Sequence, residues 1–183
     1  MPRSRGIGGI EASALEIGRM RRRHLRGVMA IERQVYARPW SPNLFAAEIT
    51  DPANRCYLVA RIHKEVVGYG GLICYGDEAH ITNVAVDPMH QGHSVATRIL
   101  VELIGQGIEM GARAISLEVR VTNWAAQRIY ARFGFRPVGI RRKYYQEVNE
   151  DALIMWTDDV RTAAYRHRLD GIAAALPESV RPA

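Results

Sequence analysis

The chain has 183 residues, of which 48% are hydrophobic and 24% charged, with two cysteines and a formal net charge of +6. This length allows one domain to bury a core without disulfides or metals. No run approaches the roughly 18 apolar residues of a membrane span, and no signal-peptide core is present, so the sequence predicts a cytoplasmic protein without a membrane partner. The spacing of Cys56 and Cys74 fits no metal site.

Most of the positive charge lies near the ends of the chain. Residues 1–26 carry seven Lys or Arg and two acidic residues, whereas residues 27–160 carry fourteen basic and fifteen acidic residues. We expect residues 1–18 to form a basic flexible leader, residues 19–160 to form the domain, and residues 161–183 to form a tail with a short helix. No aromatic residues stand between the arginines at the domain start as stacking platforms; these are Arg19, Arg21, Arg22, Arg23 and Arg26. We therefore expect no nucleic-acid partner beyond weak phosphate contacts by the leader.

Apolar periodicity and capping residues predict the elements in chain order. A first helix is predicted up to Val35, and Ser41 followed by Pro42 begins a second helix that runs to Ile49. Strands follow at residues 56–62, 66–73 and 80–86, and then a helix from Val95 that ends at Gly111. A strand at 114–121, a helix at 123–132 and strands at 135–140 and 152–157 complete the order. This order predicts an α/β (α+β) domain whose mixed, mostly antiparallel central sheet is flanked by helices and contains one βαβ crossover.

Residues 84–97 join an apolar strand to a helix through a short loop. The first N–H groups of a helix lack partners within it and the dipole is positive there, so the loop favours an anion such as a pyrophosphate. Residues 91–96 resemble the Gln/Arg-x-x-Gly-x-Gly/Ala signature with which the GNAT superfamily of N-acetyltransferases binds acetyl-CoA. Ser94 stands in place of the middle glycine. If that position has a positive φ, serine costs about 1 to 2 kcal/mol there.

The resemblance extends over roughly residues 20–157. The segments LEVRVTN at 117–123 and EDALIM at 150–155, together with Phe133-Gly134-Phe135 and Pro39-Trp40-Ser41, look like the bacterial RimI-type branch of GNAT. Members of this branch acetylate the N-terminal alanine of a small-subunit ribosomal protein. The resemblance therefore implies the GNAT fold, acetyl-CoA as co-substrate and a protein or peptide N-terminus as acceptor.

The resemblance also implies which residues hold the co-substrate. The pantetheine arm would pair with the backbone of Val84, Ala85 and Val86, as another strand would. Asn123 would cap its helix, contact the co-substrate, or do both. The phosphates would lie against the loop and the helix start, at Gly92, His93, Ser94, Val95, Ala96 and Thr97.

Two residues match the family's catalytic positions. Transfer to an α-amine, whose pKa is about 7.7 to 8.0, needs a proton acceptor, and Glu118 matches the family's base. The alternative is an exposed carboxylate on a polar strand face, paired with Arg120. Tyr130 matches the general acid that protonates the leaving thiolate, and its alternative is aromatic packing with Phe133. Neither cysteine belongs to a nucleophile arrangement, so we expect direct transfer without a covalent enzyme intermediate.

The resemblance places the acceptor between two loops, at residues 37–42 and 141–150. Trp40, Tyr144 and Tyr145 are candidates for the walls of a pocket for a small first side chain, with packing as the equal alternative. His90 and His93 lie near the phosphate loop, but no carboxylate or cysteine stands at ligand spacing, so we predict no metal there.

Three other functions stay open. A GNAT enzyme for lysine side chains or a small amine would share the same site. Ser94 permits a non-catalytic acyl-CoA sensor that binds the co-substrate without turnover. A basic ribosome-associated binding module is the least favoured, because it predicts RNA affinity that acetyl-CoA does not affect.

Overall fold

The computed structural model describes residues 15–177. The predicted helices and strands are present in the predicted order, with one additional strand at the N-terminal end. The elements are β1 (Leu15–Arg19), η1 (Arg22–His24), α1 (Leu25–Val35), α2 (Pro42–Glu48), β2 (Arg55–Ile62), β3 (Glu65–Tyr75), β4 (Glu78–Val86), η2 (Pro88–His90), α3 (Val95–Glu109), β5 (Ala114–Arg120), α4 (Trp124–Arg132), β6 (Arg136–Tyr145), η3 (Gln146–Val148), β7 (Glu150–Trp156) and α5 (Ala163–Ala174).

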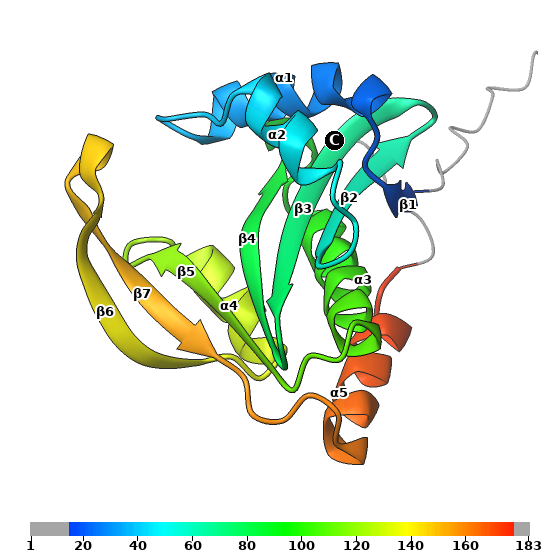
Figure 1. The fold of residues 1–183 in the computed structure, drawn as a ribbon, viewed down its shortest axis with the longest axis vertical. Coiled ribbons are helices and arrows are strands. Elements are labelled where there is room, and N and C mark those ends of the chain that lie inside the picture. The colour runs from blue at the N-terminus through cyan, green and yellow to red at the C-terminus, as the bar shows by residue number, and fades with distance from the viewer. Residues whose placement is uncertain (1–14, 178–183) are drawn as a thin grey trace, which may run out of the picture.

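The strands form one seven-stranded sheet in the order β1-β2-β3-β4-β5-β7-β6 (Figure 1). Neighbouring strands are antiparallel except for β4 and β5, which are parallel and are joined through α3. The prediction of a mixed, mostly antiparallel sheet with one βαβ crossover is therefore confirmed.

Alternate side chains of the central strands are buried in two separate hydrophobic cores, one on each face of the sheet. Cys56 and Leu58 of β2 lie in the core formed with α3 and α5, whereas Tyr57 and Val59 lie in the core formed with α1 and α2. This is the period-2 pattern of a sheet that is buried on both faces. The α3 helix packs closely on β3, because a Cβ at Gly70 would lie within 2.8 Å of side-chain atoms of α3. The helix that begins at the phosphate loop is thus held firmly against the sheet.

The expectation that residues 1–18 form a flexible leader is wrong for residues 15–18. These residues belong to β1, which pairs antiparallel with β2 from Leu15↔Ile62 to Arg19↔Leu58. Leu15 and Ile17 pack against the core on the α3 side, which explains why the segment is ordered as a strand. Residues 1–14 lie outside the described residues.

The C-terminal part also differs from the predicted boundaries. Most of the expected loop at residues 141–150 is strand, because β6 continues to Tyr145 and only residues 146–149 connect it to β7. The short helix expected after Arg161 is α5, which begins after the N-cap residue Thr162. Tyr165 and Ile172 of α5 are buried in the core with α3, so the packed domain extends beyond residue 160.

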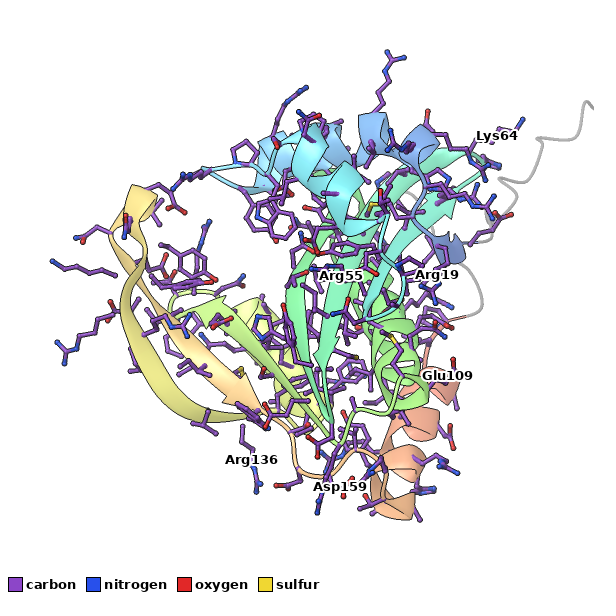
Figure 2. All side chains as sticks on the ribbon, viewed as in Figure 1. Arg19, Arg55, Lys64, Glu109, Arg136 and Asp159 are labelled. Atoms are coloured by element: carbon purple, nitrogen blue, oxygen red, sulfur yellow. The ribbon has the colours of Figure 1, made fainter. Side chains whose placement is uncertain are left out.

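No helix within residues 15–177 has the length and apolar character needed to cross a membrane. Cys56 and Cys74 are buried thiols that form no disulfide within the described residues. Arg19 and Lys64 lie at the end of the molecule that carries β1 and the turn between β2 and β3, away from the β6–β7 hairpin (Figure 2). The basic start of the domain is therefore distant from the region described next.

Candidate active site

The two parallel strands at the centre of the sheet separate part of the way along their length. β4 pairs with β5 only as far as Ile81↔Leu117. A β-bulge in β4 falls at the same point, because the pairing with β3 skips Thr82. Bulges bend and twist the strand that carries them, so β4 turns away from β5 here. Among the described residues, no strand pairs with the β5-facing side of β4 beyond Ile81.

The loop after β4 presents the N-terminus of α3 with a left-handed backbone. Gly92 has φ +80° and Ser94, the N-cap of α3, has φ +63°. The Ser94 side chain makes no capping hydrogen bond. The Gln91 side chain donates to the carbonyl oxygen of Val86 at 3.2 Å, so it braces the loop against the end of β4. This geometry leaves the first N–H groups of α3 available to an anion.

A cavity of about 480 Å³ lies between this loop, the end of β4 and α4. It is lined on the α4 side by apolar residues such as Ile129 and on the loop side by Gln91. His93 is absent from the described residues that line it. The other nine residues expected to hold the co-substrate all line it: Val84, Ala85, Val86, Gly92, Ser94, Val95, Ala96, Thr97 and Asn123.

A second cavity of about 650 Å³ lies between the α1–α2 loop and the β6–β7 hairpin, whose tip faces that loop in Figure 1. Trp40 lines it from the loop, and Tyr144 and Tyr145 line it from the hairpin. The rings of Tyr144 and Tyr145 pack edge to face with their centroids 5.1 Å apart. The guanidinium of Arg141 lies over the Tyr144 ring and that of Arg120 over the Tyr145 ring. The three aromatic residues predicted for an acceptor pocket are therefore brought together around one cavity.

Glu118 lies on the wall of this second cavity, on β5 beside β4. One of its carboxylate oxygens is 3.0 Å from His80 Nε2, and the other is 3.2 Å from a guanidinium nitrogen of Arg141. The hydrogen bond with His80 is the main cause that lowers the pKa of Glu118, and the charge of Arg141 lowers it further, while partial burial opposes both. The carboxylate is paired with these two residues and not with Arg120, so it is ionised at neutral pH and faces the cavity.

Tyr130 is one of the residues that line both cavities, with Val84 and Asn123. Its ring packs on Phe135 with centroids 5.9 Å apart, which fixes the direction of the side chain. Burial raises the pKa of the Tyr130 phenol, so the hydroxyl keeps its proton at neutral pH. Asn123 caps α4 by accepting a hydrogen bond from Ala126 N at 3.1 Å. Tyr130 therefore packs on Phe135 and also lies where the two cavities meet, so the packing does not exclude the catalytic role.

Several residues that line the second cavity were not singled out as functional from the sequence, among them Glu32, Tyr36 and His80. Glu32 lies on the buried face of α1, and Tyr36 follows it by one helical turn. The Tyr36 hydroxyl donates to the carbonyl oxygen of Val84 at 3.2 Å. His80 lies opposite Ser116 in the parallel pair β4–β5, two residues before Glu118. The only sign of His80 in the sequence was that it is a polar residue on the strand that neighbours Glu118.

No group of three or more His, Cys, Asp or Glu among residues 15–177 is arranged to hold a metal ion. His90 Nδ1 lies 3.9 Å from a carboxylate oxygen of Asp87, which makes a local pair within the loop.

The two cavities meet at the phenol of Tyr130, and the Glu118 carboxylate lines the second cavity. This arrangement suits the transfer of an acyl group from a phosphate-bearing donor to an amine. The Acetyltransferase (GNAT) family model matches residues 25–135, and the chain belongs to this family. It is an N-acetyltransferase whose acetyl donor is acetyl-CoA.

Relatives of known name are similar over most of their length. A Bacillus subtilis protein named for alanine N-acetylation of ribosomal protein bS18 is 38% identical over 137 residues, which cover 75% of this chain and 91% of the relative. The Mycobacterium tuberculosis N-alpha-acetyltransferase RimI is 33% identical, over 81% of this chain and 95% of its own. The crystal structure of the Escherichia coli ribosomal-protein-S18-alanine N-acetyltransferase superimposes with a TM-score of 0.72 at 29% identity and covers 79% of this chain and 94% of that one.

Proposed function

We propose that this enzyme acetylates the N-terminal α-amine of a protein, with an N-terminal alanine of ribosomal protein bS18 as the acceptor. The observation that carries the proposal is the meeting of two cavities at Tyr130, one beside the α3 N-terminus and one walled by Glu118 and aromatic side chains. The names of the relatives from Bacillus subtilis and Escherichia coli support the choice of acceptor.

In this proposal the first cavity holds acetyl-CoA. The β5-facing side of β4 from Val84 to Val86 offers backbone groups to the pantetheine arm, and the start of α3 offers N–H groups to the pyrophosphate. The left-handed backbone at Gly92 and Ser94 supports this fit, because it turns the loop so that the helix start is open. Acetyl-CoA supplies the acetyl thioester at the junction of the cavities.

The second cavity holds the acceptor N-terminus. Glu118 accepts the proton that the α-amine must lose, directly or through a water molecule. Tyr130 donates its proton to the departing thiolate of coenzyme A, which is a poorer leaving group when it is unprotonated. The aromatic walls at Trp40, Tyr144 and Tyr145 leave room for a small first side chain such as that of alanine. The two buried cysteines form no disulfide within the described residues, which supports a cytoplasmic location for this reaction.

Mass spectrometry of two matched peptides tests this function. One peptide carries the free N-terminal alanine of bS18 from the same organism, and the other has that amine blocked and an internal lysine available. With acetyl-CoA present, we expect a gain of one acetyl group on the first peptide only. The Glu118→Gln variant should lower kcat on the first peptide by about 100-fold or more.

The other outcomes separate the alternatives. Acetylation of the blocked peptide would move the acceptor to lysine side chains. If neither peptide gains mass although acetyl-CoA binds, the N-terminal acceptor is wrong, and a small amine or an acyl-CoA sensor replaces it. Full activity of the Glu118→Gln variant would remove Glu118 from the mechanism while leaving the acceptor assignment intact.

A further inference from the structure

Glu32 is a buried carboxylate that neither the co-substrate cavity nor the proposed chemistry uses. Its side chain is 1% exposed, on the face of α1 that packs against β3. One carboxylate oxygen accepts a hydrogen bond from the backbone N–H of Trp40 at 2.8 Å. The other accepts from the hydroxyl of Tyr69, a fully buried residue of β3. Glu32 therefore joins three parts of the fold: a helix, the sheet and the α1–α2 loop.

A buried carboxylate without an ion-pair partner carries an uncompensated desolvation cost, which points to a specific role. No Lys, Arg or His within the described residues forms an ion pair with Glu32, and burial raises the pKa of its carboxyl group. An apolar side chain of similar volume would fill the same space without the desolvation cost. An apolar side chain would leave the N–H of Trp40 without this acceptor, and that residue lies in a loop between two helices.

The loop that Glu32 holds is a wall of the acceptor cavity. Pro39, Trp40 and Ser41 all line the cavity. The Trp40 ring packs on Phe45 of α2 at 5.2 Å, and Phe45 meets Tyr69 edge to face at 5.5 Å. Glu32 is thus hydrogen-bonded to Trp40 and Tyr69, and the Phe45 ring packs against the rings of both.

We propose that Glu32 is a positioning residue that sets the selectivity of the acceptor cavity for a small first side chain. By fixing the Trp40 backbone, it keeps the Trp40 ring at the place where the first side chain of the acceptor would otherwise extend. This inference rests on the proposed function, because it assumes that an N-terminal acceptor occupies the cavity. It adds a residue at the edge of the acceptor cavity that acts through the Trp40 backbone.

A second hydrogen bond between a helix glutamate and a strand tyrosine, Glu48–Tyr57, provides a control for the Glu32–Tyr69 contact. Glu48 of α2 accepts a hydrogen bond from the Tyr57 hydroxyl of β2 at 2.9 Å, so a second helix is joined to the sheet by the same Glu–Tyr contact. Glu48 is absent from the described residues that line either cavity. Loss of Glu48 should therefore affect stability without changing acceptor selectivity.

The experiment compares kcat/KM for two peptides that differ only in the first residue, alanine or leucine. Glu32→Ala should raise the acceptor KM by about tenfold and lower the Ala/Leu ratio of kcat/KM by about fivefold or more, because the wall is no longer fixed. The KM for acetyl-CoA should change by less than about twofold. Glu32→Gln should keep most of the selectivity, because its amide oxygen still accepts from Trp40 N–H.

A second variant covers the case in which Glu32→Ala does not fold. Tyr69→Phe removes one of the two donors to Glu32 and keeps the ring in place, so it should lower the Ala/Leu ratio in the same direction by a smaller factor. The proposal is overturned if Glu32→Ala and Tyr69→Phe, or whichever of the two folds, keep the wild-type ratio, or if Glu48→Ala lowers the ratio equally. Failure of the wild-type enzyme to acetylate either peptide would instead overturn the proposed acceptor, which distinguishes the two failures.

Discussion

His80 Nε2 lies 3.0 Å from a carboxylate oxygen of Glu118, across the last paired residues of β4 and β5. The other ring nitrogen of His80 is 3.0 Å from the Ser116 hydroxyl, so the imidazole is held from both sides. A carboxylate with a fixed direction loses less freedom when an acceptor amine arrives. The strands β4 and β5 therefore separate beside His80 and Glu118, whose side chains are held in place before an acceptor binds.

The lowered pKa of Glu118 predicts a pH-dependent contribution to stability. Since its folded-state pKa lies below its unfolded value, the ionised carboxylate stabilises the fold above the unfolded pKa of about 4.3. This contribution is lost as the pH falls through the folded-state pKa. We expect Glu118→Gln to have a lower free energy of unfolding than the wild type at pH 7, and the difference to shrink below about pH 4.

Urea denaturation at a series of pH values measures this difference. Glu102→Gln is the matched control, because Glu102 is an exposed carboxylate on α3 that makes no ion pair within the described residues. An equal difference between wild type and Glu118→Gln at pH 7 and at pH 3 would contradict the linkage.

Tyr130→Phe should lower kcat by about 100-fold or more, because the variant cannot donate a proton to the leaving thiolate. The ring contact with Phe135 is kept, so the KM for acetyl-CoA should stay within about twofold. Steady-state kinetics checks both values. Tyr165→Phe is the control, since among the described residues the Tyr165 hydroxyl is buried without a hydrogen-bond partner and Tyr165 lines neither cavity. Equal activity of the two variants would show that the Tyr130 hydroxyl has no role in turnover.

Ser94→Gly should stabilise the protein, because Ser94 has a left-handed backbone with φ +63° that glycine adopts without strain. The relief is partly offset by the greater freedom of glycine in the unfolded chain, so the free energy of unfolding should rise by about 0.5 to 1 kcal/mol. Thermal or urea denaturation measures the change. Ser94→Ala keeps the strain and should not stabilise, and a gain of equal size in both variants would assign the effect to the hydroxyl.

The sequence predicted the parts of the site that depend on local rules. The phosphate loop followed from a strand, a glycine and a helix start. The polar strand face considered for Glu118 agrees with the alternating burial along β5. The prediction that Ser94 costs energy depended on a positive φ, which the structure has. The roles of Glu118 and Tyr130 in catalysis stay predictions.

The features that were missed depend on contacts between distant residues. Glu32 has a helical position like its apolar neighbours, and its role appears only through its contacts with the Trp40 backbone and with Tyr69, 37 residues away. β1 is five residues long, too short for its alternation to stand out from the preceding segment. The end of β6 was assigned to a loop because its residues are mostly exposed and polar, so burial gave no pattern to follow.

The arrangement of the two cavities has a consequence for the order of events. Because they have separate walls and share only a few residues, among them Tyr130 and Val84, acetyl donor and peptide can be present together. Double-reciprocal plots at several fixed peptide concentrations should therefore intersect, as expected for a ternary complex. Parallel lines would indicate that the acetyl group first rests on the enzyme.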